Sequence, residues 1–277
     1  MSFPLISNTK SWFLNRLGRA SALEEAGVDT VALPVAGHAA RLPLAWRKTS
    51  GQGVRVAVLD TGLATAHPQF AGRLKPGHTR DFTHSPRGVE DILGHGTYCA
   101  GLIGAPPDGG RPLGLAPAVE LLIAKVIPDC GDPREEALAA AGQWALRAGA
   151  HILSMSFGGS APLPALHRVL QEATGQGVLA FAPIAVGRGR RVVYPAAYPE
   201  VIAVGCAEVR RSRRARKDDP AEPDLVVPGH DLRSTALHGR YTVESGSSAA
   251  TAYAAALGAL ALAGAGKIGR QGDLAEA

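Results

Sequence analysis

The feature that most constrains the fold of this chain is a series of short apolar segments in which polar residues do not alternate. Five of them lie at residues 54–59, 121–126, 151–156, 178–182 and 201–204. Unbroken apolar runs of this length are typical of strands buried on both faces of a parallel sheet. Segments with helical spacing lie between them. This alternation predicts an α/β fold with a doubly wound, mostly parallel sheet and helices on both faces.

The clearest helical segment is expected to begin at Asp132 as N-cap. Pro133 would lie in its first turn, and Glu135 would complete a start similar to a capping box. Its apolar residues recur at helical spacing, at Leu138, Ala141, Trp144 and Ala145, and Gly149 follows. Sites in doubly wound sheets lie beyond the carboxyl ends of the strands, and Asp60 lies at such an end.

The two ends of the chain do not follow this pattern. Residues 1–41 are expected to form a partly ordered N-terminal extension, with a short helix at 21–27 and a strand at 28–35. The main domain is expected at 42–264, and residues 265–277 read as a glycine-containing C-terminal tail.

The composition limits the protein classes and cellular locations that are expected for this chain. No run of 18 apolar residues occurs, so no membrane span is expected. The N-terminus lacks the apolar segment of a secretory signal. The three cysteines, Cys99, Cys130 and Cys206, are odd in number and form no metal-type cluster. We therefore expect no structural disulfide, no metal and no cofactor, and a reducing cytoplasm as the location.

The net charge of +5 is unevenly distributed, because residues 210–217 hold six basic residues in eight. Such a run can attract nucleic acid. This run contains no aromatic residue for base stacking, so we favour a solvated surface loop. An acidic substrate or partner is the alternative, and nucleic-acid binding is disfavoured.

Three short motifs carry the chemistry. They are Val-Leu-Asp-Thr-Gly at 58–62, Gly-His-Gly-Thr at 94–97 and Ser-Gly-Ser-Ser-Ala at 245–249. An Asp-Thr-Gly alone also occurs in aspartic proteases, where two carboxylates share a proton. Only one is present here, and that reading leaves the other two motifs unexplained. Together, in the order Asp, His, Ser, the motifs resemble those of the subtilisin-like serine peptidases, the subtilases.

The resemblance implies a catalytic triad. Ser248 would be the nucleophile, His95 the general base and Asp60 the carboxylate that orients His95. The plainer readings are an N-cap serine for Ser248 and a satisfied core histidine for His95. In the segment 246–252, Ser247 and Ala252 replace a threonine and a proline of the family pattern. His67 matches a structural part of that pattern, and Cys99, one helical turn beyond His95, is read as a packing residue.

The resemblance also implies a groove that holds an extended peptide by strand addition. One side would be formed by Ser156, Phe157, Gly158 and Gly159, whose glycines leave edge groups open. Lys125, Val126 and Ile127 would form the opposite side, although Pro128 behind them removes a donor.

One departure concerns the oxyanion hole. Subtilases complete it with an asparagine side chain, whereas Val186 stands at that position and the chain's only asparagines are Asn8 and Asn15. The Ser248 N–H would remain as a donor, and Arg188 or Arg190 could replace the amide. Loss of this donor costs about 100- to 1000-fold in subtilisin, the family's own example.

The function that follows is a serine endopeptidase that acts through an acyl-enzyme on a specific protein or precursor peptide. The extension at 1–41 is too short for the family's full propeptide, which disfavours broad digestion. Two alternatives stay open: a catalytically impaired peptide-binding module, and a leader-cleaving or transpeptidating enzyme of a ribosomal-peptide pathway. The expected partner is a peptide or protein substrate, and the sequence does not indicate an oligomeric state.

Overall fold

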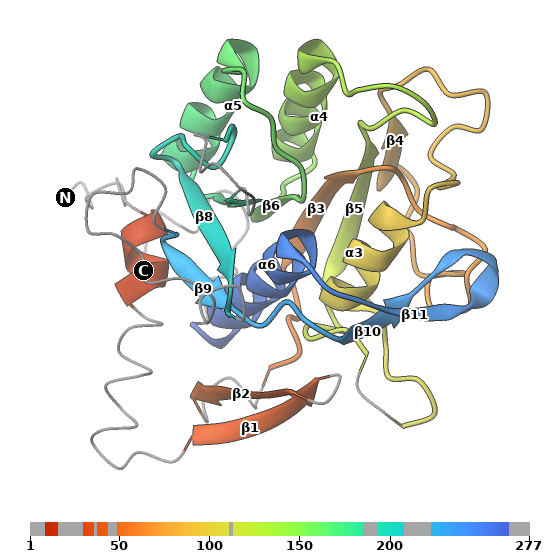
Figure 1. Cartoon of the computed structure of the whole chain (residues 1–277), viewed down its shortest axis with the longest axis vertical. Coiled ribbons are helices and arrows are strands. Elements are labelled where there is room, and N and C mark those ends of the chain that lie inside the picture. The colour runs from red at the N-terminus through yellow and green to blue at the C-terminus, as the bar shows by residue number, and fades with distance from the viewer. Residues whose placement is uncertain are drawn as a thin grey trace.

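The protein is described by a computed structural model that covers residues 9–15, 30–35, 38–43, 49–110, 113–184, 193–207 and 223–265. Its centre is a seven-stranded sheet in the order β4-β5-β3-β6-β7-β8-β9. Every neighbouring pair in this sheet is parallel. Helices lie on both sides of it (Figure 1). The predicted doubly wound α/β fold is confirmed.

Five central strands lie within one or two residues of the predicted apolar runs. They are β3 (Arg55–Asp60), β5 (Glu120–Lys125), β6 (Ile152–Met155), β7 (Leu179–Pro183) and β8 (Val201–Cys206). The edge strands β4 (Thr79–Asp81) and β9 (Leu225–Val227) were not predicted, because three residues are too few to show a pattern.

The two faces of the sheet have separate cores. Val56 and Val58 of β3 point to one core, which contains helices α3 (His95–Gly104) and α6 (Ser247–Gly264). Ala57 and Leu59 point to the other, which contains α4 (Glu135–Arg147) and α5 (Pro164–Gly175). Alternate residues of one strand face opposite sides, so the stretch 56–59 of β3 must be apolar at every position.

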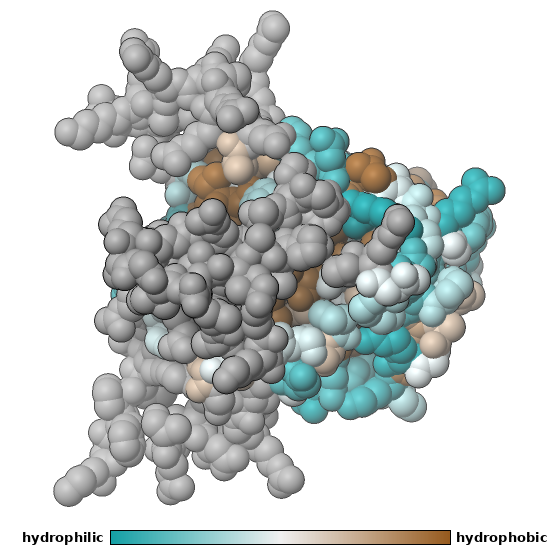
Figure 2. Space-filling view, turned by 90° about the horizontal axis from the view of Figure 1, so that it is seen from below, coloured by the Kyte–Doolittle hydropathy of each residue, from teal (hydrophilic) through white to brown (hydrophobic). Residues whose placement is uncertain are grey.

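Helix α6 is apolar on all sides because it lies inside the molecule. Its small residues allow close approach to the sheet: a Cβ on Gly258 would lie 3.0 Å from the Phe181 ring. Among the described helices, α6 alone is long and apolar enough to cross a membrane, but 72% of it is buried within the protein. Seen from below, the described surface is largely hydrophilic with smaller hydrophobic areas (Figure 2).

The predicted N-cap of α4, Asp132, is wrong by two residues. The helix begins at Glu135, and its N-cap, Arg134, makes no side-chain cap hydrogen bond. Glu135 accepts a hydrogen bond from the N–H of Ala165 in the first turn of α5. The carboxylate that the capping box needs is therefore used to join two helices. The predicted buried face of α4 is confirmed.

Part of the N-terminal region packs against the domain. Residues 9–15 are helical, and the buried Phe13 ring meets Phe181 edge-on at 5.4 Å. Lys10 Nζ lies 2.7 Å from both Asp224 Oδ2 and the carbonyl oxygen of Val201. The partly ordered packing that we expected is thus found for residues 9–15.

Two antiparallel hairpins accompany the sheet. In the first, β1 (Thr30–Val35) pairs with β2 (His38–Pro43), and β1 falls within the strand predicted at 28–35. In the second, β10 (Leu232–Thr235) pairs with β11 (Tyr241–Glu244) just before α6. The predicted helix at 21–27 and the basic run at 210–217 lie outside the described residues, as does the tail beyond residue 265. The domain boundaries stay predictions.

The strand order places a crevice at the end of β3. The chain passes from β3 through α3 to β5 on one side of β3, and then through α4 to β6 on its other side. The winding direction reverses at β3, and ligands bind at such a switch point beyond the carboxyl ends of the strands. Asp60 is the last residue of β3.

Candidate active site

Asp60 is held in a tight turn at the end of β3. Its side chain is 1% exposed, and its Oδ1 accepts the Thr61 N–H at 2.7 Å. Gly62 follows with φ +113°, and a Cβ there would lie 2.2 Å from the carbonyl oxygen of Val89. Only glycine permits this conformation and this approach. The Asp-Thr-Gly motif is therefore required by the backbone path as well as by the carboxylate.

His95 is the first residue of α3 and faces Asp60. Its Nδ1 lies 2.7 Å from Asp60 Oδ1, so this pair has the predicted contact. A Cβ on Gly96 would lie 2.3 Å from the carbonyl oxygen of Gly62, which explains the glycine after the histidine. The Gly96 N–H donates to Thr61 Oγ1 at 2.8 Å and fixes the helix start against the Asp60 turn.

Asp91 organises the loop that carries His95. One carboxylate oxygen accepts the N–H groups of Leu93 and Gly94, at 3.0 and 2.9 Å. The other accepts the N–H and the hydroxyl of Thr97, at 2.9 and 2.7 Å. These hydrogen bonds from Thr97 and Gly94 lower the pKa of Asp91 despite its burial. Sequence reasoning missed this residue, although a carboxylate before a helix start is a recognised capping signal.

The neighbours of His95 favour its protonated form. An anionic Cys99 sulfur would raise the pKa of His95, and so does the Asp60 carboxylate, against the effect of burial. Burial raises the pKa of the Cys99 thiol itself, so the sulfur is neutral at pH 7. Of the effects that remain, burial lowers the pKa of His95, and the Asp60 carboxylate raises it by its charge and its hydrogen bond.

Ser248 is the second residue of α6, after Gly246 with φ +153°. Its hydroxyl donates to the carbonyl oxygen of Ser156 at 3.2 Å, and the Ser156 hydroxyl donates to the carbonyl oxygen of Ser248 at 3.3 Å. The predicted hydrogen bond from Ser248 to His95 is thus replaced by one to Ser156. Because a serine hydroxyl turns about one bond, the reactive geometry needs a different side-chain rotamer.

Contacts connect the three motif residues across the site. Cys99 Sγ lies 3.9 Å from His95 Nδ1, and Cys99 also shares a hydrogen bond with Ser156, the partner of Ser248. Among the described residues, one group of side chains could hold a metal ion. It consists of Asp60, His95 and Cys99, whose ligand atoms lie within 4.8 Å of one another. This group coincides with the acid–base pair, and Cys99 is fully buried as the packing interpretation expects.

The groove side expected at Lys125, Val126 and Ile127 is not supported by the structure. The first two side chains are fully buried in the described fold. The N–H groups of Val126 and Ile127 both donate to the Asp60 carbonyl oxygen, and the Lys125 carbonyl oxygen accepts from Phe82. These backbone groups belong to the sheet ladder, so they are not free to bind an extended peptide.

On the opposite side, the substrate-binding role of Ser156, Phe157 and Gly158 stays a prediction. Phe157 is half-buried and Gly158 is exposed, next to the buried Ser156 that contacts Ser248. Gly159, however, forms an antiparallel bridge with Tyr194 in which its N–H and carbonyl are both used. The open edge therefore excludes Gly159. Val186, Arg188 and Arg190 lie outside the described residues.

Comparison with known proteins identifies related sequences. Residues 51–271 match the family model described as "Subtilase family". The chain is 37% identical over 231 residues to "Intracellular serine protease" of Paenibacillus polymyxa, covering 79% of this chain and 69% of that protein. It is 36% identical over 248 residues to "Major intracellular serine protease" of Bacillus subtilis (strain 168), covering 85% and 76%. With "Subtilisin Savinase" of Lederbergia lenta the identity is 34% over 214 residues, covering 77% and 78%.

Proposed function

Since this chain belongs to the subtilase family and is a subtilisin-like serine endopeptidase, we propose that Ser248, His95 and Asp60 carry out its catalysis. The observation that supports this assignment most directly is the 2.7 Å contact between His95 Nδ1 and Asp60 Oδ1. This contact fixes which nitrogen of the imidazole carries the proton. It leaves Nε2 as the base for a serine hydroxyl.

The reaction proceeds in two halves. The Ser248 hydroxyl turns from Ser156 toward His95, transfers its proton to Nε2 and attacks the substrate carbonyl carbon. The imidazolium then protonates the departing amine, and an acyl-enzyme remains on Ser248. Water, deprotonated by His95, attacks the ester, and the imidazolium returns this proton to the Ser248 oxygen as the bond to the acyl group breaks and the second product leaves. Asp60 stabilises the imidazolium at each stage without itself taking the proton.

The oxyanion needs donors at the end of α6. The N–H groups in the first turn of a helix have no intrahelical acceptor, so the Ser248 N–H is available to a developing negative charge. Arg188 or Arg190 is proposed as the second donor, in place of the family asparagine.

Replacement of Val186 by asparagine tests this arrangement. Val186→Asn should raise kcat, by up to about the 100-fold that this donor contributes in subtilisin. Arg188→Ala combined with Arg190→Ala should lower kcat by about 10-fold or more. A 10-fold loss corresponds to about half of the roughly 2.7 kcal/mol that is the smallest contribution of the asparagine donor in subtilisin. No gain in the first variant and no loss in the second would exclude these residues as oxyanion donors.

The substrate is a peptide or protein, and we propose a defined protein or precursor peptide. A cytoplasmic location is proposed because two relatives carry "intracellular" in their names. The binding-module alternative is not favoured, since the related proteins are named as proteases.

Labelling with a fluorophosphonate tests the assignment of the nucleophile. Mass spectrometry should find the adduct on Ser248, and Ser248→Ala should abolish labelling. Ser247→Ala is the matched control and should retain it. If the wild-type protein neither reacts with the fluorophosphonate nor cleaves peptides, the peptidase proposal is contradicted and the peptide-binding module takes its place.

A further inference from the structure

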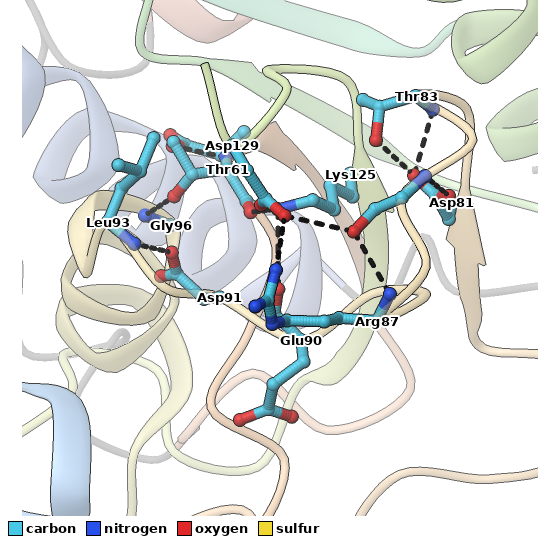
Figure 3. A network of polar contacts seen from close by, with 12 residues as sticks. Thr61, Asp81, Thr83, Arg87, Glu90, Asp91, Leu93, Gly96, Lys125 and Asp129 are labelled. Atoms are coloured by element: carbon cyan, nitrogen blue, oxygen red, sulfur yellow. Dashed lines mark hydrogen bonds and ion pairs between the residues drawn. The ribbon is translucent and has the colours of Figure 1, made fainter.

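Lys125 is a buried cation next to the proposed triad, and no step of the acylation or deacylation described above involves it. Its side chain is 0% exposed, and it lies at the end of β5 in register with Asp60 of β3. A buried ammonium is costly unless its protons are all bonded. Three acceptors surround this one, and they come from three different segments of the chain (Figure 3).

Two of the acceptors are backbone carbonyls of the turns that carry the acid–base pair. Lys125 Nζ donates to the carbonyl oxygen of Thr61 at 2.5 Å and to that of Glu90 at 3.3 Å. Thr61 donates its N–H to Asp60 Oδ1, and its hydroxyl accepts the Gly96 N–H next to His95. The residue that Lys125 fixes thus contacts both halves of the pair.

The second carbonyl belongs to the loop of His95. Glu90 precedes Asp91, whose carboxylate binds the N–H groups of Leu93, Gly94 and Thr97 around the start of α3. Figure 3 shows Asp91 with Leu93 and Gly96 near Thr61, to the left of Lys125. One ammonium group therefore joins the Asp60 turn to the His95 loop.

The third acceptor, Asp129, is the counter-ion. Its Oδ1 lies 2.8 Å from Lys125 Nζ, and its side chain is 18% exposed. Its Oδ2 accepts from Ser85 Oγ at 3.1 Å and faces Arg87 Nη1 at 3.4 Å. Lys125, then Ser85 and Arg87, lower the pKa of Asp129. The carboxylate compensates the buried charge, while the two carbonyl contacts set the geometry.

We propose that Lys125 is a positioning residue for catalysis, which holds the Asp60 turn and the His95 loop at a fixed separation through the carbonyls of Thr61 and Glu90. This role rests on the proposed triad. A misplacement of about 1 Å between reacting groups can reduce a rate about 100-fold, so a cross-link at this point affects kcat more than substrate binding.

The test uses Lys125→Met, which keeps the length of the side chain and removes its donors. kcat should fall by about 10- to 100-fold, while KM changes by less than about 3-fold. Lys75→Met is the matched control, because Lys75 is 59% exposed, pairs with Glu120 and lies outside the site. All rates are measured well below the unfolding transition of each variant.

A double variant separates positioning from stability. Lys125→Met alone leaves Asp129 with only the longer ion pair to Arg87 among its described cationic contacts, whereas Lys125→Met with Asp129→Asn removes both charges and should recover stability. Catalysis should not recover, because the carbonyls of Thr61 and Glu90 still lack a donor. Recovery of kcat together with stability would overturn the proposal.

A spectroscopic signature provides a readout that does not need turnover. The proton between His95 Nδ1 and Asp60 Oδ1 should give a low-field proton resonance in the wild type. This resonance should shift or broaden in Lys125→Met and stay in place in Lys75→Met. An unchanged resonance with an unchanged kcat would assign Lys125 to stability alone, whereas an unreactive wild type would count against the triad itself.

Discussion

At the scale of single residues, the hydroxyl of Ser248 lies in a resting position. It donates to the Ser156 carbonyl oxygen rather than to His95. The acid–base pair opposite it is already formed, with the Asp60 carboxylate buried against the imidazole. In the proposed triad, activation requires the Ser248 hydroxyl to leave this acceptor and turn toward His95.

Single substitutions of the nucleophile and the base should be nearly equivalent. Ser248→Ala and His95→Ala should each reduce kcat by up to about a million-fold, as in subtilisin, because they take part in the same proton transfer. The double variant should be no slower than either single one by more than a few-fold. Steady-state hydrolysis of a peptide ester measures this, and losses that multiply would show two independent steps.

The raised pKa of His95 predicts the acid side of the pH profile. His95 accepts a proton only when neutral, so kcat/KM should fall as pH decreases, with a midpoint above the usual pKa of about 6.5. Asp60→Asn should lower the plateau by about 10⁴-fold and move this midpoint to lower pH. Glu200→Gln, whose carboxylate pairs with His167, should leave the midpoint unchanged. A midpoint unaffected by Asp60→Asn would contradict the assigned cause.

At the scale of secondary-structure elements, the start of α3 depends on a carboxylate from the preceding loop. The N-cap, Gly94, has no side chain to cap the helix, and Asp91 supplies the acceptors instead. Four donors converge on it, from Leu93, Gly94 and Thr97. This explains how a helix with glycine at its N-cap holds the histidine in place.

Asp91→Ala should destabilise the protein by about 1–3 kcal/mol, since it leaves buried donors without an acceptor. The pKa of Asp91 is lowered on folding, so its stabilisation is complete above its unfolded pKa of about 3.9 and is lost as pH falls toward the folded value. Urea unfolding between pH 3 and 7 measures both effects. The variant should lose less stability than the wild type below pH 4, and parallel curves would refute the linkage.

At the scale of the whole molecule, the helical segment 9–15 covers part of the core that α6 and the sheet share. Phe13 is fully buried against Phe181, and a Cβ on Gly258 of α6 would touch the same ring. Lys10 adds an ion pair to Asp224. The segment thus contributes to the domain's core rather than to its surface.

Phe13→Ala should lower the free energy of unfolding by up to about 3–5 kcal/mol, the range for removal of a buried phenylalanine side chain. Because the cavity lies in the α6 core and not at the Asp60 turn, kcat should change little below the transition. Asn15→Ala, at an exposed position of the same segment, is the control. A change below about 0.5 kcal/mol, typical of surface positions, would show that the segment is not docked.

The sequence alone determined the central strands and the residues of the acid–base pair. Stretches such as 56–59 and 201–204 are apolar at every position because both faces of each strand are buried, and that pattern is local. Gly62 and Gly96 belong to the motifs that identified Asp60 and His95 in the sequence. The structure explains these glycines, because a Cβ at either position would collide with a backbone carbonyl oxygen. The helical start at Ser248 follows from an alanine-rich run of small residues.

Only the tertiary structure decided which partners these residues have. Lys125 read as part of a substrate groove, but its ammonium is bonded to Thr61, 64 positions earlier in the chain. Gly159 was predicted to leave its backbone groups open, but they pair with Tyr194. The Ser248 hydroxyl was predicted to contact His95, but it donates to the carbonyl oxygen of Ser156, 92 positions away. Each contact joins segments that are brought together by strand order. A sequence pattern reports the burial of a residue's own segment, whereas the acceptor of a buried donor depends on which distant backbone the fold places beside it.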